Sequence, residues 1–494
     1  MMIAVPEWLR QRAYLSPDRL ALVFQQERWT YRELDQRVTQ AANRLHTLGI
    51  GAESRVGVLM NNSADFVVLV HAISRVGAVL ILLNRRLSPA EIEWQITDSA
   101  PQIVICDDPE HVKSGMSVEQ FNALPETPAT YPEQIDLENV RCILYTSGTT
   151  GKPKGAMLTH GNFWWSAIGS ALNLGTLDSD VWLVCLPLFH VGGLSILFRA
   201  VIYGVPVILH EKFDPAAVNQ AIIYEQVTII SVVSNTLQRM LDVQPIQPIQ
   251  PIQPVQPVQP NYPATLRCVL LGGGPAPKPL LEDCARRNIP VLQTYGLTET
   301  ASQVVTLSPA DALRKLGSAG KPLFPNEVRI ENREGPGEIG EIIVRGPTVF
   351  AGYLNPMSAT EETPIRDGWL HTGDLGYLDA EGYLYIVDRR SDLIISGGEN
   401  VYPAEIEAVL LAHTSIAEAG VIGISDARWG QVAVAIVRVR DGAQVTADAL
   451  RVFCTGHLAR YKVPAEIRFT TSPLPRSAAG KLLRRELAEA WTEE

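Results

Sequence analysis

The chain lacks the features that define several common protein classes. Its six cysteines (positions 106, 142, 185, 268, 284 and 454) are scattered, and no two form a C-x-x-C pair. This spacing argues against a disulfide framework or a zinc site, and it predicts reduced, mostly buried thiols in a cytoplasmic protein. The formal net charge of −11 leaves no basic footprint for non-specific nucleic-acid binding.

Targeting and membrane segments are also missing from the pattern. The first residues, from Met1 to Trp8, have neither the basic flank nor the long apolar core of a signal peptide. The most apolar region, 66–83, is broken by His71 and Arg75. It therefore predicts a buried helix followed by a buried strand, not a membrane span. A chain of 494 residues with 46% hydrophobic and 19% charged residues is typical of a globular protein with at least two domains.

Short apolar runs alternate with amphipathic stretches up to about residue 388. Runs of four or five apolar residues predict strands at 56–60, 79–83, 103–106, 181–185, 205–209, 229–233 and 268–271. Helical periodicity is found at 64–76 and 89–98. This β-α-β order predicts an α/β region with parallel sheets, more than one in number, covered by helices.

The C-terminal part has a different pattern. A compact helix–strand–strand–helix order is expected at 405–411, 417–424, 432–439 and 447–460. It predicts a small α+β domain of ordinary size.

Residues 244–260 repeat Gln-Pro-Ile/Val, and a proline at every third position favours a polyproline II helix. Two interpretations are open: a ligand for an SH3-type groove, or a simple-sequence expansion in a surface loop. The flanking stretches 237–241 and 266–271 are typical of a core, which favours the surface loop. We assign the repeat no catalytic role.

The most informative stretch is 145–155, Tyr-Thr-Ser-Gly-Thr-Thr-Gly-Lys-Pro-Lys-Gly, directly after an apolar run. Glycines allow backbone N–H groups to face a ligand, and hydroxyls and lysines suit phosphates. The Walker A pattern cannot be laid over it. A generic glycine-rich loop is the alternative to a nucleotide site.

This stretch resembles the phosphate loop of the acyl-adenylate-forming (AMP-binding) superfamily, which contains acyl-CoA synthetases, luciferases and peptide-synthetase adenylation domains. The resemblance implies a large adenylation domain (1–388), a hinge (389–391) and a small mobile domain (392–494). It also implies ATP and Mg²⁺ as cofactors. The loop residues implied to bind the nucleotide are Thr146, Ser147, Gly148, Thr149, Thr150, Gly151 and Lys152.

A second motif, Gln293-Thr-Tyr-Gly-Leu-Thr-Glu-Thr-Ala-Ser302, follows an expected strand at 289–292. Parallel sheets bind ligands at such carboxyl ends. Tyr295 offers a ring for adenine, Thr298 a hydroxyl for phosphate and Glu299 an oxygen for Mg²⁺. Otherwise, Tyr295 is a core residue and Glu299 a helix N-terminal acid. In the resembled family the motif, with Thr294 and Gly296, binds AMP.

Further matches extend the resemblance. Gly272, Gly273, Gly274 and Pro275 end a strand where the family has its purine-edge segment, although tight turns use the same residues. Asp374, in Thr-Gly-Asp, matches the carboxylate that binds the ribose hydroxyls; a turn-forming aspartate is the alternative.

Matches continue into the C-terminal part. Arg389 matches the family's nucleotide-binding arginine, Ser391 the hinge, and Gly397 and Gly398 the loop that meets CoA. The register Pro-x-Ser-x-x-Gly-Lys-x-x-Arg makes Lys481 the catalytic lysine. A terminal basic patch at the surface is the alternative.

The acid substrate depends on Phe189-His190 and the residues after it. In the family an aromatic–histidine pair gates the acyl pocket, whereas amino-acid-activating relatives commonly have aspartate here. A buried core histidine is the alternative for His190. The implied acyl pocket contains His190, Gly192, Gly193, Ser195, Ser234 and Ser302. In it, Gly192, Gly193 and Ser195 are expected to leave room and polar contacts for an aromatic dicarboxylate.

Segments 187–210 and 390–407 most resemble the o-succinylbenzoate–CoA ligases of menaquinone and phylloquinone synthesis. The resemblance implies that the acid reacts with ATP to acyl-AMP and pyrophosphate, and that CoA then displaces AMP. The expected catalytic residues are Lys481, His190, Thr298 and Glu299. An aryl- or fatty-acid–CoA ligase is the runner-up.

Transfer to a carrier protein, luciferase-type oxidation and a non-catalytic nucleotide-binding protein are further alternatives. We expect no nucleic-acid partner and no transmembrane segment. A homodimer is compatible with the sequence, which does not give the oligomeric state.

Overall fold

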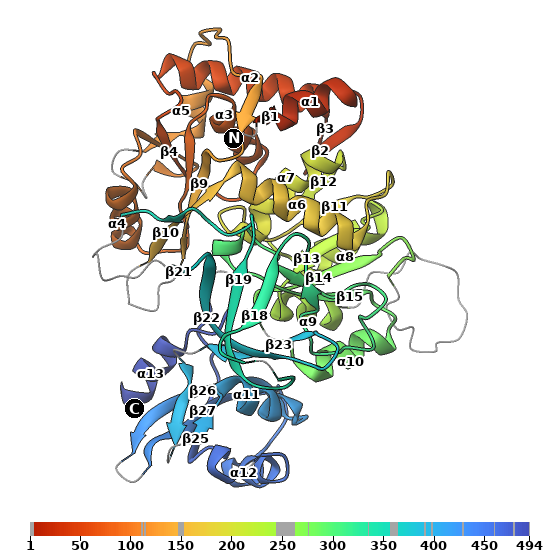
Figure 1. The fold of residues 1–494 in the computed structure, drawn as a ribbon, viewed down its shortest axis with the longest axis vertical. Helices are drawn as coiled ribbons and strands as arrows, with labels where there is room; N and C mark the ends of the chain where they lie inside the picture. Colours follow the sequence, from red (N-terminus) through yellow and green to blue (C-terminus); the bar gives the residue numbers. More distant parts are fainter. Residues whose placement is uncertain are drawn as a thin grey trace.

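A computed structural model describes residues 4–109, 112, 115–146, 153–243, 262–274, 276–333, 335–355, 364–389, 392–396, 399–426, 429–458, 460–477 and 480–493. The Gln-Pro repeat at 244–260 lies outside these residues. Figure 1 shows an elongated molecule in which the chain from red to teal lies above a smaller blue C-terminal part. No helix within the described ranges is long and apolar enough to cross a membrane.

Two large sheets form the N-terminal part of the described chain. The first contains, in spatial order, β20 (Gly352–Tyr353), β10 (Lys154–Thr159), β9 (Val140–Thr146), β5 (Val79–Leu82), β4 (Arg55–Leu59), β6 (Ile103–Cys106) and β7 (Met116–Ser117). The second contains β17 (Lys321–Pro322), β16 (Val305–Thr306), β15 (Val291–Tyr295), β14 (Cys268–Leu271), β13 (Ile229–Val232), β11 (Trp182–Val184), β12 (Val207–Leu209), β2 (Leu20–Phe24) and β3 (Glu27–Thr30). The expected parallel α/β arrangement is confirmed in both.

Helices cover these sheets. In this region they are α1 (Trp8–Leu15), α2 (Tyr31–Thr47), α3 (Ala64–Arg75), α4 (Pro89–Ser99), α5 (Val118–Asn122), α6 (His160–Leu174), α7 (Val191–Tyr203), α8 (Pro215–Tyr224), α9 (Ser234–Asp242) and α10 (Lys278–Arg286). A short ladder joins β1 (Ala4–Pro6) to β8 (Gln134–Asp136). Capping boxes begin α2 at Thr30 and α4 at Ser88, so two of the free N-terminal N–H groups of each helix are satisfied locally.

A third, antiparallel sheet departs from the expected alternation. Its strands are β18 (Glu327–Ile330), β19 (Gly340–Arg345), β22 (Trp369–Leu378), β21 (Ile365–Arg366) and β23 (Leu384–Arg389). No helix of the described chain lies between β16 and β23. The alternating pattern thus ends near residue 305, earlier than predicted, because β18, β19 and β22 are antiparallel neighbours that need only short connections.

The C-terminal part has its own sheet and cores. Its strands are β25 (Glu399–Val401), β24 (Ile394–Ser396), β27 (Gly430–Val439), β26 (Ile416–Asp426) and β28 (Glu466–Thr470), and its helices are α11 (Pro403–Ala412), α12 (Ala447–Thr455) and α13 (Arg484–Glu493). Two separate hydrophobic clusters fill it. The helix predicted over 447–460 is shorter than expected, since α12 ends at Thr455 and a 3₁₀ turn, η4 (Arg460–Lys462), follows.

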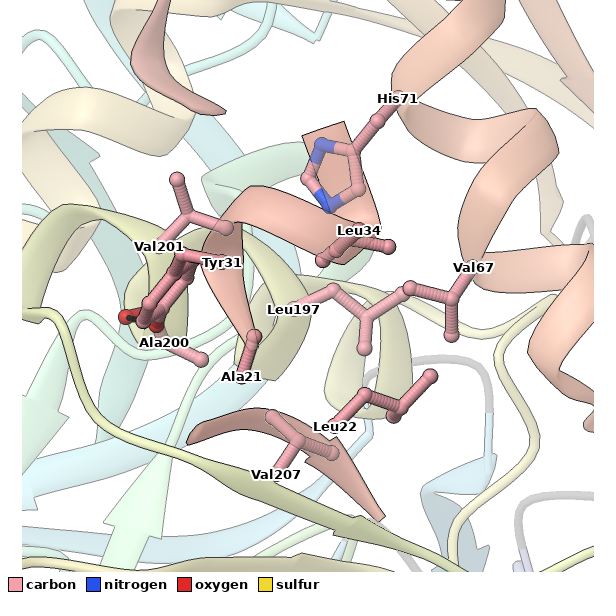
Figure 2. A pocket seen from close by; sticks show the side chains of 10 residues that line it. All are labelled: Ala21, Leu22, Tyr31, Leu34, Val67, His71, Leu197, Ala200, Val201 and Val207. Atoms are coloured by element: carbon pink, nitrogen blue, oxygen red, sulfur yellow. Dashed lines mark hydrogen bonds between the residues drawn. The ribbon is translucent and has the colours of Figure 1, made fainter. Parts of the chain in front are cut away.

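All six cysteines are free and buried, as predicted. A small cavity of about 10 Å³, room for roughly one water molecule, lies where α2, α3 and α7 meet β2 and β12. Figure 2 shows His71 of α3 and Tyr31 of α2 among the apolar side chains around it. None of the predicted site residues lines this cavity.

Candidate active site

The phosphate loop connects two antiparallel strands. Thr146 at the end of β9 pairs with Lys154 at the start of β10, and its hydroxyl donates to the Lys154 carbonyl at 3.5 Å. The predicted loop residues Ser147, Gly148, Thr149, Thr150, Gly151 and Lys152 lie outside the described residues. The strand before the loop is anchored by the Tyr145 hydroxyl, which donates to Asp98 Oδ2 at 2.7 Å. Burial, together with Asp98, raises the pKa of Tyr145.

The motif at 293–302 lies at the carboxyl end of a parallel strand, as predicted. Strand β15 begins at Val291, two residues later than expected, and it includes Tyr295 of the motif. Tyr295 is nearly buried, and its hydroxyl donates to Asp374 Oδ2 at 2.8 Å. The Thr294 hydroxyl is used within the sheet, on the Val305 carbonyl at 2.9 Å. The phenol–carboxylate bond brings two predicted nucleotide residues from different sheets together.

Gly296 is required by a close crossing of the backbone. A Cβ at this position would collide with the carbonyl oxygen of Ser302. Two successive residues after the 3₁₀ turn η2 (Thr298–Thr300) have left-handed backbones, Ala301 with φ 50° and Ser302 with φ 91°. Such conformations are uncommon for side-chain-bearing residues and cluster at functional sites.

Thr298 and Glu299 lie in η2, directly after this crossing. The side chain of Glu299 is partly buried, and its Oε1 accepts the Tyr353 hydroxyl at 2.7 Å. Within the described residues its Oε2 makes no hydrogen bond. Carboxylate oxygens are ligands that Mg²⁺ prefers, so Glu299 fits this cation.

Asp374 lies on β22 where the pairing of this strand with β19 is irregular. Gly373 before it has φ 73°, and its N–H donates to Glu341 Oε1 at 2.9 Å. The Thr372 hydroxyl donates to the Ile342 carbonyl and accepts the Asp374 N–H at 3.1 Å. The backbone of Arg389 on β23 pairs with Asp374, so the two predicted nucleotide residues are neighbours in the ladder. The side chain of Arg389 lies outside the described part.

The glycines after β14 leave space beside β15. A Cβ at Gly272 would come within 2.9 Å of Thr294 Cγ2, Gly273 has φ 80°, and a Cβ at Gly274 would meet nothing within 4 Å. Gly272 is thus needed for packing, and Gly274 lies next to open space. Pro275 lies outside the described residues.

His190 caps α7 at the predicted acyl pocket. Its ring packs on Phe189, with centroids 4.7 Å apart, and its Nε2 is buried with no hydrogen-bond partner in the described chain. Burial, and then the charges of Arg86 and Lys481, lower the pKa of His190 to about 4. The imidazole is therefore neutral at physiological pH, and two cations lie near it.

The other predicted pocket residues divide into two groups. A Cβ at Gly193 would collide with the Pro187 carbonyl oxygen, so the expected free space at this glycine is wrong: backbone fills it. Ser195 is only 2% exposed. Gly192 has more room, with Leu186 Cδ1 at 3.5 Å from a built Cβ. Ser234, the first residue of α9, and Ser302 are partly exposed.

Lys481 approaches this pocket from the C-terminal part. A Cβ built at Gly480 (φ 79°) would lie 3.0 Å from Val233 Cγ2, directly before Ser234. The Ser477 N–H donates to the Lys481 carbonyl at 2.7 Å, which closes a tight turn. The structure thus places the turn with Lys481 against the start of α9 and within electrostatic reach of His190. The predicted CoA-binding glycines 397 and 398 and the hinge residue Ser391 lie outside the described residues.

Arg484, three residues after Lys481, was not assigned a role from the sequence. Its guanidinium lies 2.7 Å from Asp392, 2.8 Å from Glu407 and 3.7 Å from Asp388. Burial raises the pKa of Glu407 despite this cation. The cluster fixes the turn that carries Lys481 to α11 and to the end of β23. The sequence offered one signal for a role of Arg484, namely its position as the arginine of the Gly-Lys-x-x-Arg register.

Comparisons with known proteins agree with this geometry. Residues 9–354 match the AMP-binding enzyme family and residues 405–481 match the AMP-binding enzyme C-terminal domain. The chain is 50% identical over 500 residues to a 2-succinylbenzoate–CoA ligase of Bacillus cereus, with 100% of both chains covered.

Solved structures of the o-succinylbenzoate CoA synthetase of Bacillus subtilis have the same fold. Its complex with the acyl-adenylate intermediate OSB-AMP matches with a TM-score of 0.90 at 43% identity, covering 98% of both chains. Its complex with ATP and magnesium ion matches with the same TM-score and identity, covering 98% of this chain and 100% of the other. This chain belongs to the AMP-binding enzyme family.

Proposed function

We propose that this chain is an AMP-forming acid–CoA ligase that acts on 2-succinylbenzoate, the o-succinylbenzoate of menaquinone and phylloquinone synthesis. The observation that carries the proposal is the position of the turn with Lys481, against α9 and near His190, in a chain similar over its whole length to 2-succinylbenzoate–CoA ligases. ATP and Mg²⁺ are then its cofactors, and CoA is its co-substrate.

The first half-reaction joins the acid to AMP. A carboxylate oxygen of the substrate attacks the α-phosphorus of ATP, the bond to the β-phosphate oxygen breaks, and pyrophosphate leaves. An anion must approach a polyanion, so much of the barrier is electrostatic. Lys481 offsets this repulsion at the carboxylate and α-phosphate, and the loop 146–152 holds the departing pyrophosphate. When bound, Mg²⁺ neutralises phosphate charge. Glu299 would hold it, and Thr298 offers its hydroxyl to a phosphate.

The large part of the chain orients the nucleotide. Asp374 accepts the ribose hydroxyls, and Tyr295, whose hydroxyl holds Asp374, presents its ring to adenine. Because one hydrogen bond joins the two side chains, ribose and base are positioned by a single rigid unit. Arg389, opposite Asp374 in the ladder, completes this edge.

The second half-reaction needs Lys481 to leave. The CoA thiol attacks the acyl carbonyl carbon, the bond to AMP breaks, and AMP leaves. We propose that residues 392–494 rotate about 389–391, which withdraws Lys481 and brings the glycines 397 and 398 to CoA. The two hydrophobic clusters of the C-terminal part contain residues of that part alone, which supports its movement as one body.

A panel of acids tests the function. The purified chain is given ATP, Mg²⁺ and CoA, and both pyrophosphate release and thioester are measured with 2-succinylbenzoate, benzoate and medium-chain fatty acids. We expect rapid release and a CoA thioester with 2-succinylbenzoate alone. No turnover of this acid beside fast turnover of benzoate or fatty acids would favour the runner-up, an aryl- or fatty-acid–CoA ligase.

We also propose a cytoplasmic enzyme, which the six free, buried cysteines support. A homodimer stays a prediction, and light scattering of the purified chain tests it.

A further inference from the structure

Tyr353 was not singled out in the sequence, yet it contacts the candidate magnesium ligand. Its hydroxyl donates to Glu299 Oε1 at 2.7 Å, a short bond to a charged acceptor. The residue lies 54 positions from Glu299 along the chain, so the bond joins distant segments. Tyr353 belongs to β20, the edge strand of the first sheet, whereas Glu299 follows β15 of the second.

The same strand is fastened to the phosphate-loop hairpin. Tyr353 pairs with Ala156 of β10, and the Leu354 N–H donates to the Gly155 carbonyl at 2.7 Å. The Lys154 ammonium lies 5.5 Å from the centroid of the Tyr353 ring, within the range of a cation–π contact. Lys154 begins the strand that leaves the phosphate loop.

A second contact fixes the backbone of η2. The Phe350 N–H donates to the Glu299 carbonyl at 2.9 Å, and the ring of Phe350 packs edge-on against Tyr353 with centroids 4.8 Å apart. Residues 350–354 therefore hold Glu299 by its carbonyl and its carboxylate, and hold β10 by the ladder.

We propose that Tyr353 is a positioning residue for metal–ATP binding, an inference that rests on the function proposed above. Its phenol occupies Glu299 Oε1 and leaves Oε2 to the divalent cation that accompanies the triphosphate. Because Tyr353 is also paired with β10, the carboxylate is held in register with the strand that follows the phosphate loop. Tyr353 acts on the divalent cation through Glu299.

The test separates the contribution of the divalent cation to ATP affinity from the affinity for ATP alone. The affinity of the full chain for ATP is measured by calorimetry with Mg²⁺ and with EDTA, for the native protein and for Tyr353→Phe, which keeps the ring. We expect the Kd in Mg²⁺ to rise about tenfold, the size of one hydrogen bond to a charged group. The Kd in EDTA stays within about twofold, and the Mg²⁺ concentration for half-maximal pyrophosphate release rises.

Two further variants complete the design. Tyr377→Phe, on β22 away from Glu299, changes neither Kd. In a Glu299→Gln background the Tyr353→Phe change adds no further loss in Mg²⁺, because the carboxylate that it orients is gone.

An equal rise in Mg²⁺ and in EDTA, or no rise in Mg²⁺, overturns the inference. Failure of the proposed function has a different signature: the native chain releases no pyrophosphate with 2-succinylbenzoate, while the ratio of the two ATP affinities still reports on Tyr353.

Discussion

The nucleotide edge of the large part and the turn with Lys481 meet at one site but are fixed by different means. The nucleotide edge, formed by Gly296, Glu299 and Asp374, is fixed by a backbone crossing and by two phenol–carboxylate bonds. The turn with Lys481 is fixed by one arginine among three carboxylates. The part that we propose to stay is built by packing. In the part that we propose to move, the two shorter contacts of the arginine go to Asp392 and Glu407 of that same part, and the third goes to Asp388 at the border of the large part.

This difference has a functional reason. A site that must hold a nucleotide through two reactions benefits from donors and acceptors that do not reorganise. A lysine that acts in just one of the two reactions has different requirements. It benefits from a rigid attachment to its own domain and from a weak contact with the large domain. Gly480 against Val233 is such a contact, since it joins a glycine to an apolar side chain.

Arg484→Met gives the largest expected effect on stability and tests the anchor of the turn. It leaves Glu407 and Asp388 nearly buried without their cation, and breaking a buried pair in this way costs about 3–5 kcal/mol. We expect a matching loss in the unfolding free energy of the C-terminal part, measured by hydrogen exchange of α11 and β26. Arg485→Met is the control, because Arg485 forms only an exposed i,i+4 ion pair with Glu489. We expect it to change the unfolding free energy by about 0.5 kcal/mol or less. Equal effects of the two changes would show that the cluster is not the anchor.

Gly296→Ala tests whether the backbone crossing at Ser302 fixes the nucleotide edge of the large part. The added methyl group collides with the Ser302 carbonyl oxygen, and overpacking of this kind costs about 1–3 kcal/mol. We expect ATP affinity to fall with stability, because the crossing positions Tyr295 and Glu299. Urea unfolding and calorimetry measure the two. Gly51→Ala is the control, since its Cβ would meet nothing within 4 Å. Native ATP affinity in Gly296→Ala would contradict the role of the crossing.

The sequence predicted the alternating strands and helices well because each has its own apolar period. The strand 268–271 and the helix beginning at Ala64 are found where expected. Two strands of the third sheet, β18 and β21, were missed because they are only four and two residues long, too short for a period.

The predicted site residues have been brought together where motifs named them, as with Tyr295 and Asp374. Tyr353 and Arg484 were not assigned, because their roles depend on partners that the chain pattern does not place. Gly193 was misread for a similar reason. A glycine in a pocket motif suggests space, but only the fold shows that the Pro187 carbonyl fills it.

Mild acidification gives the smallest expected effect on stability. We expect it to destabilise the large part more than the C-terminal part. Burial lowers the pKa of His71 to about 3 and that of His160 well below 6.5, and both residues belong to the large part. The unfolded chain therefore binds more protons as pH falls through about 6.5, so stability is full above this pH and is lost below it. We expect about 0.7 kcal/mol of loss for each histidine between pH 7 and 6.

Urea unfolding at these two pH values measures the loss. Most carboxylates titrate well below this window, so it isolates histidine. Equal or greater stability of the large part at pH 6 would contradict the prediction.

The most direct measurement compares the two half-reactions of Lys481→Ala. The first is pyrophosphate release from 2-succinylbenzoate and ATP, and the second is thioester formation from supplied acyl-AMP and CoA. We predict that the first slows by about 10²–10³, the size of one preorganised charge at a transition state, while the second stays near the native rate. Equal loss in both half-reactions would contradict a lysine that serves only the first, and with it the division of the site between a fixed and a moving part.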